Sequence, residues 1–235
     1  GTEDGLNTQG VDTKNQMIAL AEHPTAFHHI AMMPDFHLGY GMPIGGVMAC
    51  LNAVIPNAVG NDIGCGMLAV QTDLSASAFT KDNLQTIRLA IHRRVPVGEA
   101  RHQREQDLPI VGNYDLDVES MYGEGTFMAG SLVTVARLQM GTLGGGNHFI
   151  ELQADAEDNL WIMIHSGSRG VGAKMCAYYS KRAQEECERW HAAVPKDLAF
   201  FPTDSDDGKR YLADMEWAMK FAEGNRHEIW QQVCS

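Results

Sequence analysis

The sequence predicts an α+β fold in which mixed β-sheets are flanked by helices and a metal site lies at the ends of the strands. Short apolar runs of strand length end in glycine-rich loops that carry carboxylates, thiols and imidazoles. Two long amphipathic stretches, residues 173–194 and 205–232, have the apolar period of helices. The chain has 235 residues, of which 44% are hydrophobic, so it can bury the core of a single domain that spans residues 1–235.

The composition is acidic, and this limits the partners that charge alone would attract. The formal net charge of −12 lowers the nonspecific affinity for nucleic acid, so an RNA would have to bind at a local basic patch or through a metal ion. The five cysteines are an odd number at irregular spacing, and no signal-peptide pattern precedes them, so we expect free thiols in the reducing cytoplasm. No apolar run approaches the roughly 18 residues that a membrane span needs.

The first part of the chain is expected to contain a short helix and a buried strand. Residues 1–12 are polar and are typical of a frayed start, whereas residues 13–21 have a helical period. Residues 27–33 follow as a buried strand. Asp35 and His37 come directly after this strand and would project to the same side of an extended chain. They could belong to one site, or Asp35 could cap a turn in which His37 is satisfied locally.

The stretch of residues 59–67 is the most unusual of the chain. Three glycines surround Asp62 and Cys65 directly after an apolar run, which is more glycine than a connection between two elements needs. A carboxylate and a thiolate that converge from a tight turn could hold a borderline transition metal. The alternative is a glycine turn with a buried cysteine, because free cysteine is among the most buried residue types. Residues 67–72 leave the loop as another strand.

The middle of the chain carries a basic cluster in an otherwise acidic protein. A helix is expected over residues 80–94, and Pro96 and Gly98 end it. A solvated helix face is the usual explanation of such a cluster, and contact with nucleic acid is the alternative. Residues 105–130 are expected to form a long loop with one short helix, and residues 131–140 a short helix or strand. The basic cluster consists of Arg88, His92, Arg93, Arg94, Arg101, His102 and Arg104.

Two histidines lie beside glycines at the ends of apolar strands. Residues 144–146 are consecutive glycines that precede His148, and His165 ends the buried strand of residues 160–164. The spacing of the two histidines suits neighbouring strands of one hairpin. Each histidine alone is more often a core residue than a ligand, but with residues 59–67 there are three glycine-flanked stretches that offer metal-binding side chains. We therefore expect a metal site formed by Asp62, Cys65, His148 and His165.

Four ordered motifs of this chain resemble those of the RtcB family of RNA-splicing ligases. The resemblance covers the chain from about residue 27 to residue 226. Four motifs of this length in one order are a far more specific signal than a single glycine pattern. The motifs are residues 33–39, 59–67, 141–151 and 165–172.

The resemblance implies ligation of tRNA halves or broken RNA, in which a 3'-phosphate or 2',3'-cyclic phosphate end is joined to a 5'-hydroxyl end. It implies two manganese ions as cofactors, held by the positions that match Asp62, Cys65, His148 and His165. In the family, a guanylate from GTP is attached to a histidine, passed to the RNA 3'-phosphate and displaced by the 5'-hydroxyl. The metal ions would neutralise the triphosphate and the transferring phosphoryl group.

The resemblance also implies roles for residues around the metal ligands. Contact with the guanine nucleotide is implied for Asn147, His148, Phe149, Ile150 and Glu151. Support of the site, or contact with RNA phosphates, is expected from Asp35, His37, Ser166, Arg169, Asn225 and Arg226.

The chain also departs from the family pattern. The family continues past the position of Ser235 with a further metal histidine and with the guanylylated histidine, so no histidine here can be assigned as the nucleophile. Tyr40 stands where the family has a lysine, and residues 105–140 are shorter than in the family. We expect either a piece of a longer ligase or a natural short form. In a piece, exposed apolar surface would favour association with other chains.

Two other functions fit the same residues. A metal-dependent phosphoesterase that acts on RNA phosphates would need the metal pair but no histidine nucleophile. A catalytically silent metal-binding or assembly subunit would bind manganese without a covalent guanylate or turnover.

Overall fold

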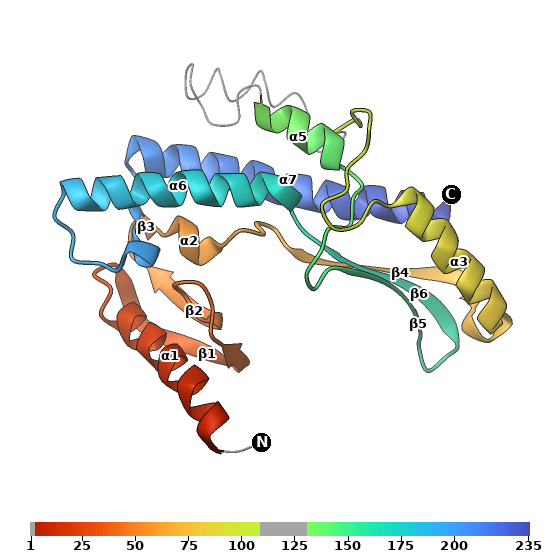
Figure 1. The fold of residues 1–235 in the computed structure, drawn as a ribbon, viewed down its shortest axis with the longest axis horizontal. Coiled ribbons are helices and arrows are strands. Elements are labelled where there is room, and N and C mark those ends of the chain that lie inside the picture. The colour runs from red at the N-terminus through yellow and green to blue at the C-terminus, as the bar shows by residue number, and fades with distance from the viewer. Residues whose placement is uncertain (1–2, 109–130) are drawn as a thin grey trace. The chain divides into compact units, whose positions relative to one another are not determined.

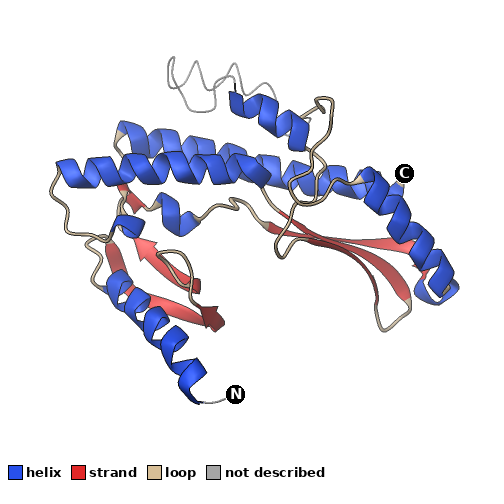
Figure 2. Cartoon of the chain, viewed as in Figure 1, coloured by secondary structure: helices blue, strands red, loops and turns tan. Residues whose placement is uncertain are grey.

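The structure is a computed structural model that describes residues 3–108 and 131–235 (Figure 1, Figure 2). Its helices and small sheets confirm the α+β class. Among these residues, no helix is long and apolar enough to cross a membrane. The helices are α1 (Glu3–Ala21), α2 (Pro56–Val59), η1 (Ala76–Ala78), α3 (Lys81–Arg94), α5 (Ser131–Gln139), α6 (Arg169–Arg189), η2 (Lys196–Leu198) and α7 (Asp206–Cys234). The strands are β1 (Ala26–His37), β2 (Ile44–Cys50), β3 (Ala53–Val54), β4 (Gly66–Ser75), β5 (Phe149–Ala154), β6 (Asn159–Ser166) and β7 (Phe201–Pro202).

Two compact units share the chain, and each is described by itself. Unit 1 comprises the described residues up to Asn61 together with Lys174–Ala213, and unit 2 comprises those of Asp62–Ala173 together with Asp214–Ser235. The long helices α6 and α7 therefore each carry residues of both units. The single domain over residues 1–235 stays a prediction.

In unit 1, β1 and β2 form an antiparallel ribbon, and β3 pairs with β7. Ile30 and Met32 of β1 pack on a core that is centred on Leu20 of α1. The rest of β1 is mostly exposed, with Phe27 42% and Met33 50% accessible, so the expected burial of residues 27–33 is wrong. Successive side chains of a strand point to opposite faces, and among the described residues a core covers only one face of this ribbon.

Helices α1 and α6 differ from the predictions in their boundaries, and α6 begins at Arg169 rather than at residue 173. Helix α1 begins at Glu3 rather than at residue 13, and residues 3–12 contain no proline that would interrupt it. Helix α6 ends at Arg189, not at residue 194, because His191 has the left-handed φ of 57° that terminates helices. Helices α3 and α7 lie where they were predicted. For residues 131–140 a short helix or a strand was predicted, and the structure has the helix α5 there. Most of the loop predicted over residues 105–130 lies outside the described residues.

The central sheet of unit 2 has the strand order β4-β6-β5, and both pairs are antiparallel. The mixed sheets expected from the sequence are therefore wrong for the strands that the structure describes. Strands β5 and β6 are joined by a short turn at residues 155–158, and such a turn can connect only antiparallel neighbours. The hairpin expected from the spacing of His148 and His165 is confirmed.

One face of this sheet is covered by helices and the other carries His165. Ile162 and Ile164 of β6 are buried, and they form a core with Val95 after α3 and Ile229 of α7. Figure 1 shows α3 and the C-terminal part of α7 beside this sheet. Because side chains alternate along a strand, His165 projects to the face opposite Ile164.

The turn between β5 and β6 depends on one carboxylate. Oδ1 of Asp155 accepts hydrogen bonds from the backbone N–H groups of Glu157 at 3.0 Å and Asn159 at 2.9 Å. Its Oδ2 accepts from the Asn159 side-chain amide at 2.9 Å and from Trp161 Nε1 at 2.8 Å. These bonds, first that of Trp161 and then those of Asn159, lower the pKa of Asp155 to about 2.

We predict that the stabilising effect of Asp155 is lost in acid. A lowered pKa in the folded state contributes stability above the unfolded value of 3.8, and this contribution disappears as the pH falls towards about 2. The thermal unfolding midpoint of Asp155→Asn should therefore lie below that of the wild type at neutral pH and approach it in acid. Asp73→Asn, which removes an exposed carboxylate of β4, is the control. A midpoint difference that does not change with pH would contradict the prediction.

Candidate metal centre

Asp62 and Cys65 lie on a tight turn directly before β4. The Cys65 N–H donates to the Asp62 carbonyl at 3.1 Å. Gly64 has a φ of 72°, and a Cβ there would lie 2.9 Å from the backbone of α7, so only glycine allows this close approach. Arg226 of α7 donates from Nη1 to the carbonyl of Gly64 at 2.8 Å and to that of Ser166 at 2.9 Å. Helix α7 therefore holds the turn against the end of β6.

The two histidines are oriented by backbone carbonyls. His148 Nδ1 lies 2.9 Å from the Leu143 carbonyl oxygen, and His165 Nδ1 lies 3.1 Å from the Gly66 carbonyl oxygen. A carbonyl only accepts, so Nδ1 carries the proton in each neutral ring and Nε2 has a free lone pair. Metal-binding histidines in proteins typically donate their other nitrogen in this way.

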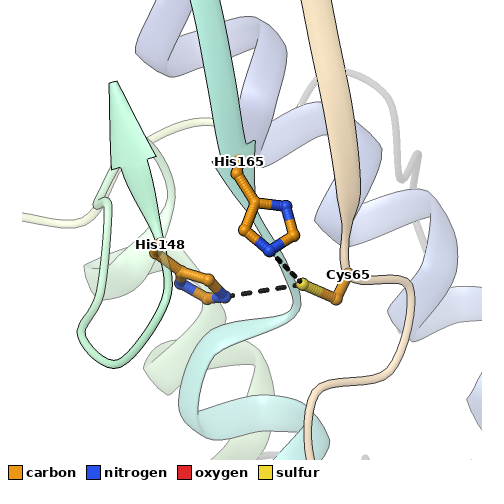
Figure 3. Close-up of side chains that lie close together, drawn as sticks. All are labelled: Cys65, His148 and His165. Atoms are coloured by element: carbon orange, nitrogen blue, oxygen red, sulfur yellow. Dashed lines mark hydrogen bonds between the residues drawn. The ribbon is translucent and has the colours of Figure 1, made fainter. Parts of the chain in front are cut away.

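The two free ring nitrogens meet at the cysteine sulfur (Figure 3). Cys65 Sγ lies 3.6 Å from His148 Nε2 and 3.5 Å from His165 Nε2, and the three potential ligand atoms are within 4.8 Å of one another. Asp62 Oδ2 lies 2.8 Å from the same Nε2 of His148. The structure thus brings together all four side chains that the sequence offered as ligands. Thiolate, imidazole and carboxylate around one point suit a divalent transition metal.

Several groups of the centre shift the pKa of Cys65. Burial, and then the hydrogen bond and charge of Asp62, raise the pKa of the Cys65 thiol to about 12, and Arg226 lowers it by a smaller amount. A thiol must lose its proton to bind a metal, and a bound cation drives that loss. A sulfur, two imidazole nitrogens and a carboxylate oxygen are thus linked by contacts of 2.8 to 3.6 Å, and this set of donor atoms fits a metal ion.

Asp62 is positioned by a glycine that the sequence analysis did not single out. A Cβ on Gly167 would overlap the Asp62 carboxylate. No left-handed φ is found at Gly167, so glycine is needed there for space alone. The signal in the sequence is weak, because a glycine between Ser166 and Ser168 after a strand reads as an ordinary loop residue.

Asn225 of α7 is fully buried and connects both histidine segments. Its Oδ1 accepts from the backbone N–H groups of Gly141 at 2.8 Å and Thr142 at 3.2 Å. Its Nδ2 donates to the Thr142 carbonyl at 3.0 Å, to Ser166 Oγ at 3.1 Å and to the Gly167 carbonyl at 3.4 Å. The side-chain amide is therefore fully used inside the protein. Asn225 supports the loop before His148 and the end of β6 rather than facing solvent.

Ser166 and Arg169 also bond to the segments around the centre. Ser166 is buried and donates from Oγ to the Leu143 carbonyl at 2.8 Å. Arg169 donates to Thr142 Oγ1 at 3.4 Å and to the Gly98 carbonyl at 3.1 Å, and burial lowers its pKa. Both side chains hold loops of unit 2 in the structure, and their contact with a phosphate stays a prediction.

Leu143 is a further residue that the sequence did not reveal. Its carbonyl accepts from both His148 and Ser166, and its N–H donates to the Pro96 carbonyl at 2.9 Å. These contacts use the backbone, which every residue type offers, so no sequence pattern could have indicated them.

The remaining predicted site residues lie as follows. Asn147 and Glu151 are exposed, and Glu151 accepts a hydrogen bond from Gln153 at 2.7 Å. The Phe149 ring lies 5.5 Å from the ring of His165, and Ile150 packs on the core of unit 2. Asp35 and His37 lie on β1 in unit 1, where His37 Nδ1 is 3.0 Å from the Asp35 carbonyl oxygen. Their participation in the site stays a prediction.

Curated proteins that match this chain are named as RNA ligases. The RNA-splicing ligase RtcB of Escherichia coli K12 is 39% identical over 97% of the chain, and so is the RNA-splicing ligase RtcB1 of another Escherichia coli strain. The tRNA-splicing ligase RtcB of Methanococcus maripaludis is 29% identical over 93% of the chain. The chain spans 59% of the length of the two Escherichia coli proteins and 54% of the archaeal one.

The model of the family described as tRNA-splicing ligase RtcB matches residues 16–235. This range includes the turn of Asp62 and Cys65, both histidines, and the supporting residues of α7. The chain therefore belongs to the RtcB family of tRNA-splicing ligases.

Proposed function

We propose that this chain carries a metal-binding part of a manganese- and GTP-dependent RNA ligase. The reaction joins an RNA 3'-phosphate or 2',3'-cyclic phosphate to the 5'-hydroxyl of a second RNA. The single observation that carries the proposal is the convergence of Cys65, His148 and His165 on one point, with the Asp62 carboxylate at 2.8 Å from His148. The names of the relatives, which are RNA-splicing ligases, support the choice of substrate.

In this proposal, Nε2 of His148, Nε2 of His165 and the Cys65 sulfur are metal ligands, and Asp62 is a fourth. The manganese would neutralise phosphate charge that develops during transfer. The carbonyls of Leu143 and Gly66 keep the two imidazoles in the tautomer that leaves Nε2 free. The centre would lie where β4 begins and β6 ends, because Cys65 directly precedes Gly66 and His165 pairs with Met67.

The guanine nucleotide would bind beside His148. Asn147 and Glu151 are exposed on either side of this ligand and offer an amide and a carboxylate, the groups that could pair with a purine edge. Arg169 would contribute positive charge near the phosphates, since Asp62 and Cys65 lie close enough to raise its pKa against the effect of burial. We propose the cytoplasm as the location and tRNA halves or broken RNA as the substrate.

Removal of the cysteine should remove the metal. We predict that Cys65→Ala lowers the affinity for Mn²⁺ by at least about 100-fold, because even the supporting partners of metal ligands contribute about 10- to 100-fold. Equilibrium dialysis followed by elemental analysis measures the bound metal. Cys234→Ala, which removes another exposed cysteine of unit 2, is the matched control. Unchanged manganese binding by Cys65→Ala would refute the site.

A side chain at residue 167 should displace the carboxylate of Asp62. We predict that Gly167→Ala destabilises the protein by about 1–3 kcal/mol, because its new methyl group overlaps the Asp62 carboxylate. The double variant Asp62→Ala/Gly167→Ala removes the overlapping carboxylate and should recover most of this loss in urea unfolding.

The control for this cycle is Gly145→Ala, whose Cβ would have its nearest neighbour at an ordinary 3.7 Å. This variant should be close to the wild type in stability and in metal binding. Additive effects of the two substitutions at residues 62 and 167 would show that their side chains do not compete for space.

The ligase proposal predicts a covalent guanylate and a joined RNA. Protein expressed from the complete gene is incubated with labelled GTP, Mn²⁺ and two RNAs that carry a 3'-phosphate and a 5'-hydroxyl, and is then separated under denaturing conditions. Labelled protein and joined RNA are expected, and Cys65→Ala should lose both. Phosphate release without either product would instead indicate a phosphoesterase. Metal binding with no reaction would indicate a silent metal-binding subunit.

A further inference from the structure

A basic surface lies on α3 and the loop that follows it. Residues 81–104 carry six lysine or arginine side chains and two acidic ones, which gives a net charge of +4, whereas the rest of the chain has a net charge of −16. We call the group that extends from the middle of α3 into the loop the α3 basic surface. It consists of Arg88, His92, Arg93, Arg94, Arg101 and Arg104.

The arginines of this surface are exposed to solvent. Every arginine of the group is exposed, and within residues 3–108 and 131–235 none of them forms an ion pair. Arg88 donates from Nε to Gln85 Oε1 at 3.2 Å. With about 100° between successive helical residues, His92 lies about 40° and Arg93 about 140° round α3 from Arg88, whereas Ile91, which packs into the core, lies about 60° from Arg88 in the other direction. Within the described residues, no ion pair therefore offsets the positive charge of these arginines.

The stability of α3 explains only part of this charge. His92, Arg93 and Arg94 lie in the last helical turn, where cations interact favourably with the helix dipole. Arg88 lies earlier in the helix, and Arg101 and Arg104 lie beyond its end. The helix therefore accounts for no more than half of the group.

The loop after α3 is bonded to the segment that orients the metal ligand His148. Gly98 N–H donates to the Gly144 carbonyl at 2.7 Å, and Val97 pairs with Gly144 as a parallel bridge. Leu143 N–H donates to the Pro96 carbonyl, and the Leu143 carbonyl orients His148. Leu143 is thus bonded both to the loop of the basic surface and to His148, a proposed metal ligand.

We propose that the α3 basic surface binds the phosphate backbone of single-stranded RNA whose end is processed at the metal centre. The inference rests on the proposed function, because the choice of RNA as the polyanion comes from it. The acidity of the rest of the chain favours this surface over others for a polyanion, and its arginines offer the forked donors that suit phosphates. Such contacts release counterions and make the affinity depend on salt.

The test compares two double variants that each remove two positive charges. Arg88→Gln/Arg93→Gln changes the surface, and Lys181→Gln/Lys196→Gln changes two side chains of unit 1 that are each 79% exposed. Binding of a fluorescently labelled single-stranded RNA with a 3'-phosphate is followed by anisotropy over a range of salt concentrations, in EDTA. The Arg88→Gln/Arg93→Gln protein should bind about 5- to 10-fold more weakly, and its slope of log affinity against log salt should fall by about 1.4 for two lost contacts. The control should match the wild type.

Cys65→Ala separates this inference from the proposed function. It should bind the RNA with the wild-type salt dependence in EDTA although it has lost Mn²⁺ and the joining reaction. The inference is overturned if Arg88→Gln/Arg93→Gln binds like the control, or if the wild type shows no salt-dependent RNA binding. Loss of RNA binding by Arg88→Gln/Arg93→Gln would support the surface even if no RNA is joined.

Discussion

The buried amide of Asn225 is the interaction on which the organisation of unit 2 depends. Helix α7 supplies it, and both the loop before His148 and the end of β6 bond to it. A buried polar group without partners costs about 1–3 kcal/mol, so loss of this amide would be costly for the Gly141 N–H and the Thr142 carbonyl that bond to it. Arg226, the next residue, extends the same support to the Asp62 and Cys65 turn. One turn of a helix thereby sets the positions of all three segments that hold the candidate ligands.

This arrangement makes the centre largely preorganised. The imidazoles already have their Nδ1 atoms bonded to carbonyls, and their Nε2 atoms already face Cys65. Binding a cation would then require little ordering of side chains, which is the main cost that a flexible site has to meet.

The charge of the chain is unevenly distributed between the basic α3 surface and the acidic remainder. A polyanion is therefore repelled by most of the protein and attracted by one part.

Much of the fold and the centre could be predicted from the sequence, because glycine and apolar patterns act locally. The glycines around Asp62, Cys65 and His148 marked the loops, and the spacing of His148 and His165 predicted their hairpin. The exposure of β1 could not be predicted, because Phe27 and Met33 are apolar whether or not something covers their face. Asn225 looked like a candidate phosphate ligand because nothing local distinguishes a polar residue that is buried by tertiary contacts. Leu143 acts through its backbone, and Gly167 through the absence of a side chain, so neither left a chemical sign in the sequence.

The raised pKa of Cys65 has a consequence for the chemical durability of the protein. Thiolates, not thiols, are alkylated and oxidised, and the oxidation leads stepwise to products that cannot be reversed. Burial and the neighbouring Asp62 raise the pKa of Cys65 to about 12, so this thiol is ionised less at neutral pH than an ordinary cysteine. Cys65 is exposed, and its burial by neighbouring atoms and the nearby Asp62 carboxylate thus favour the less reactive thiol form of this side chain.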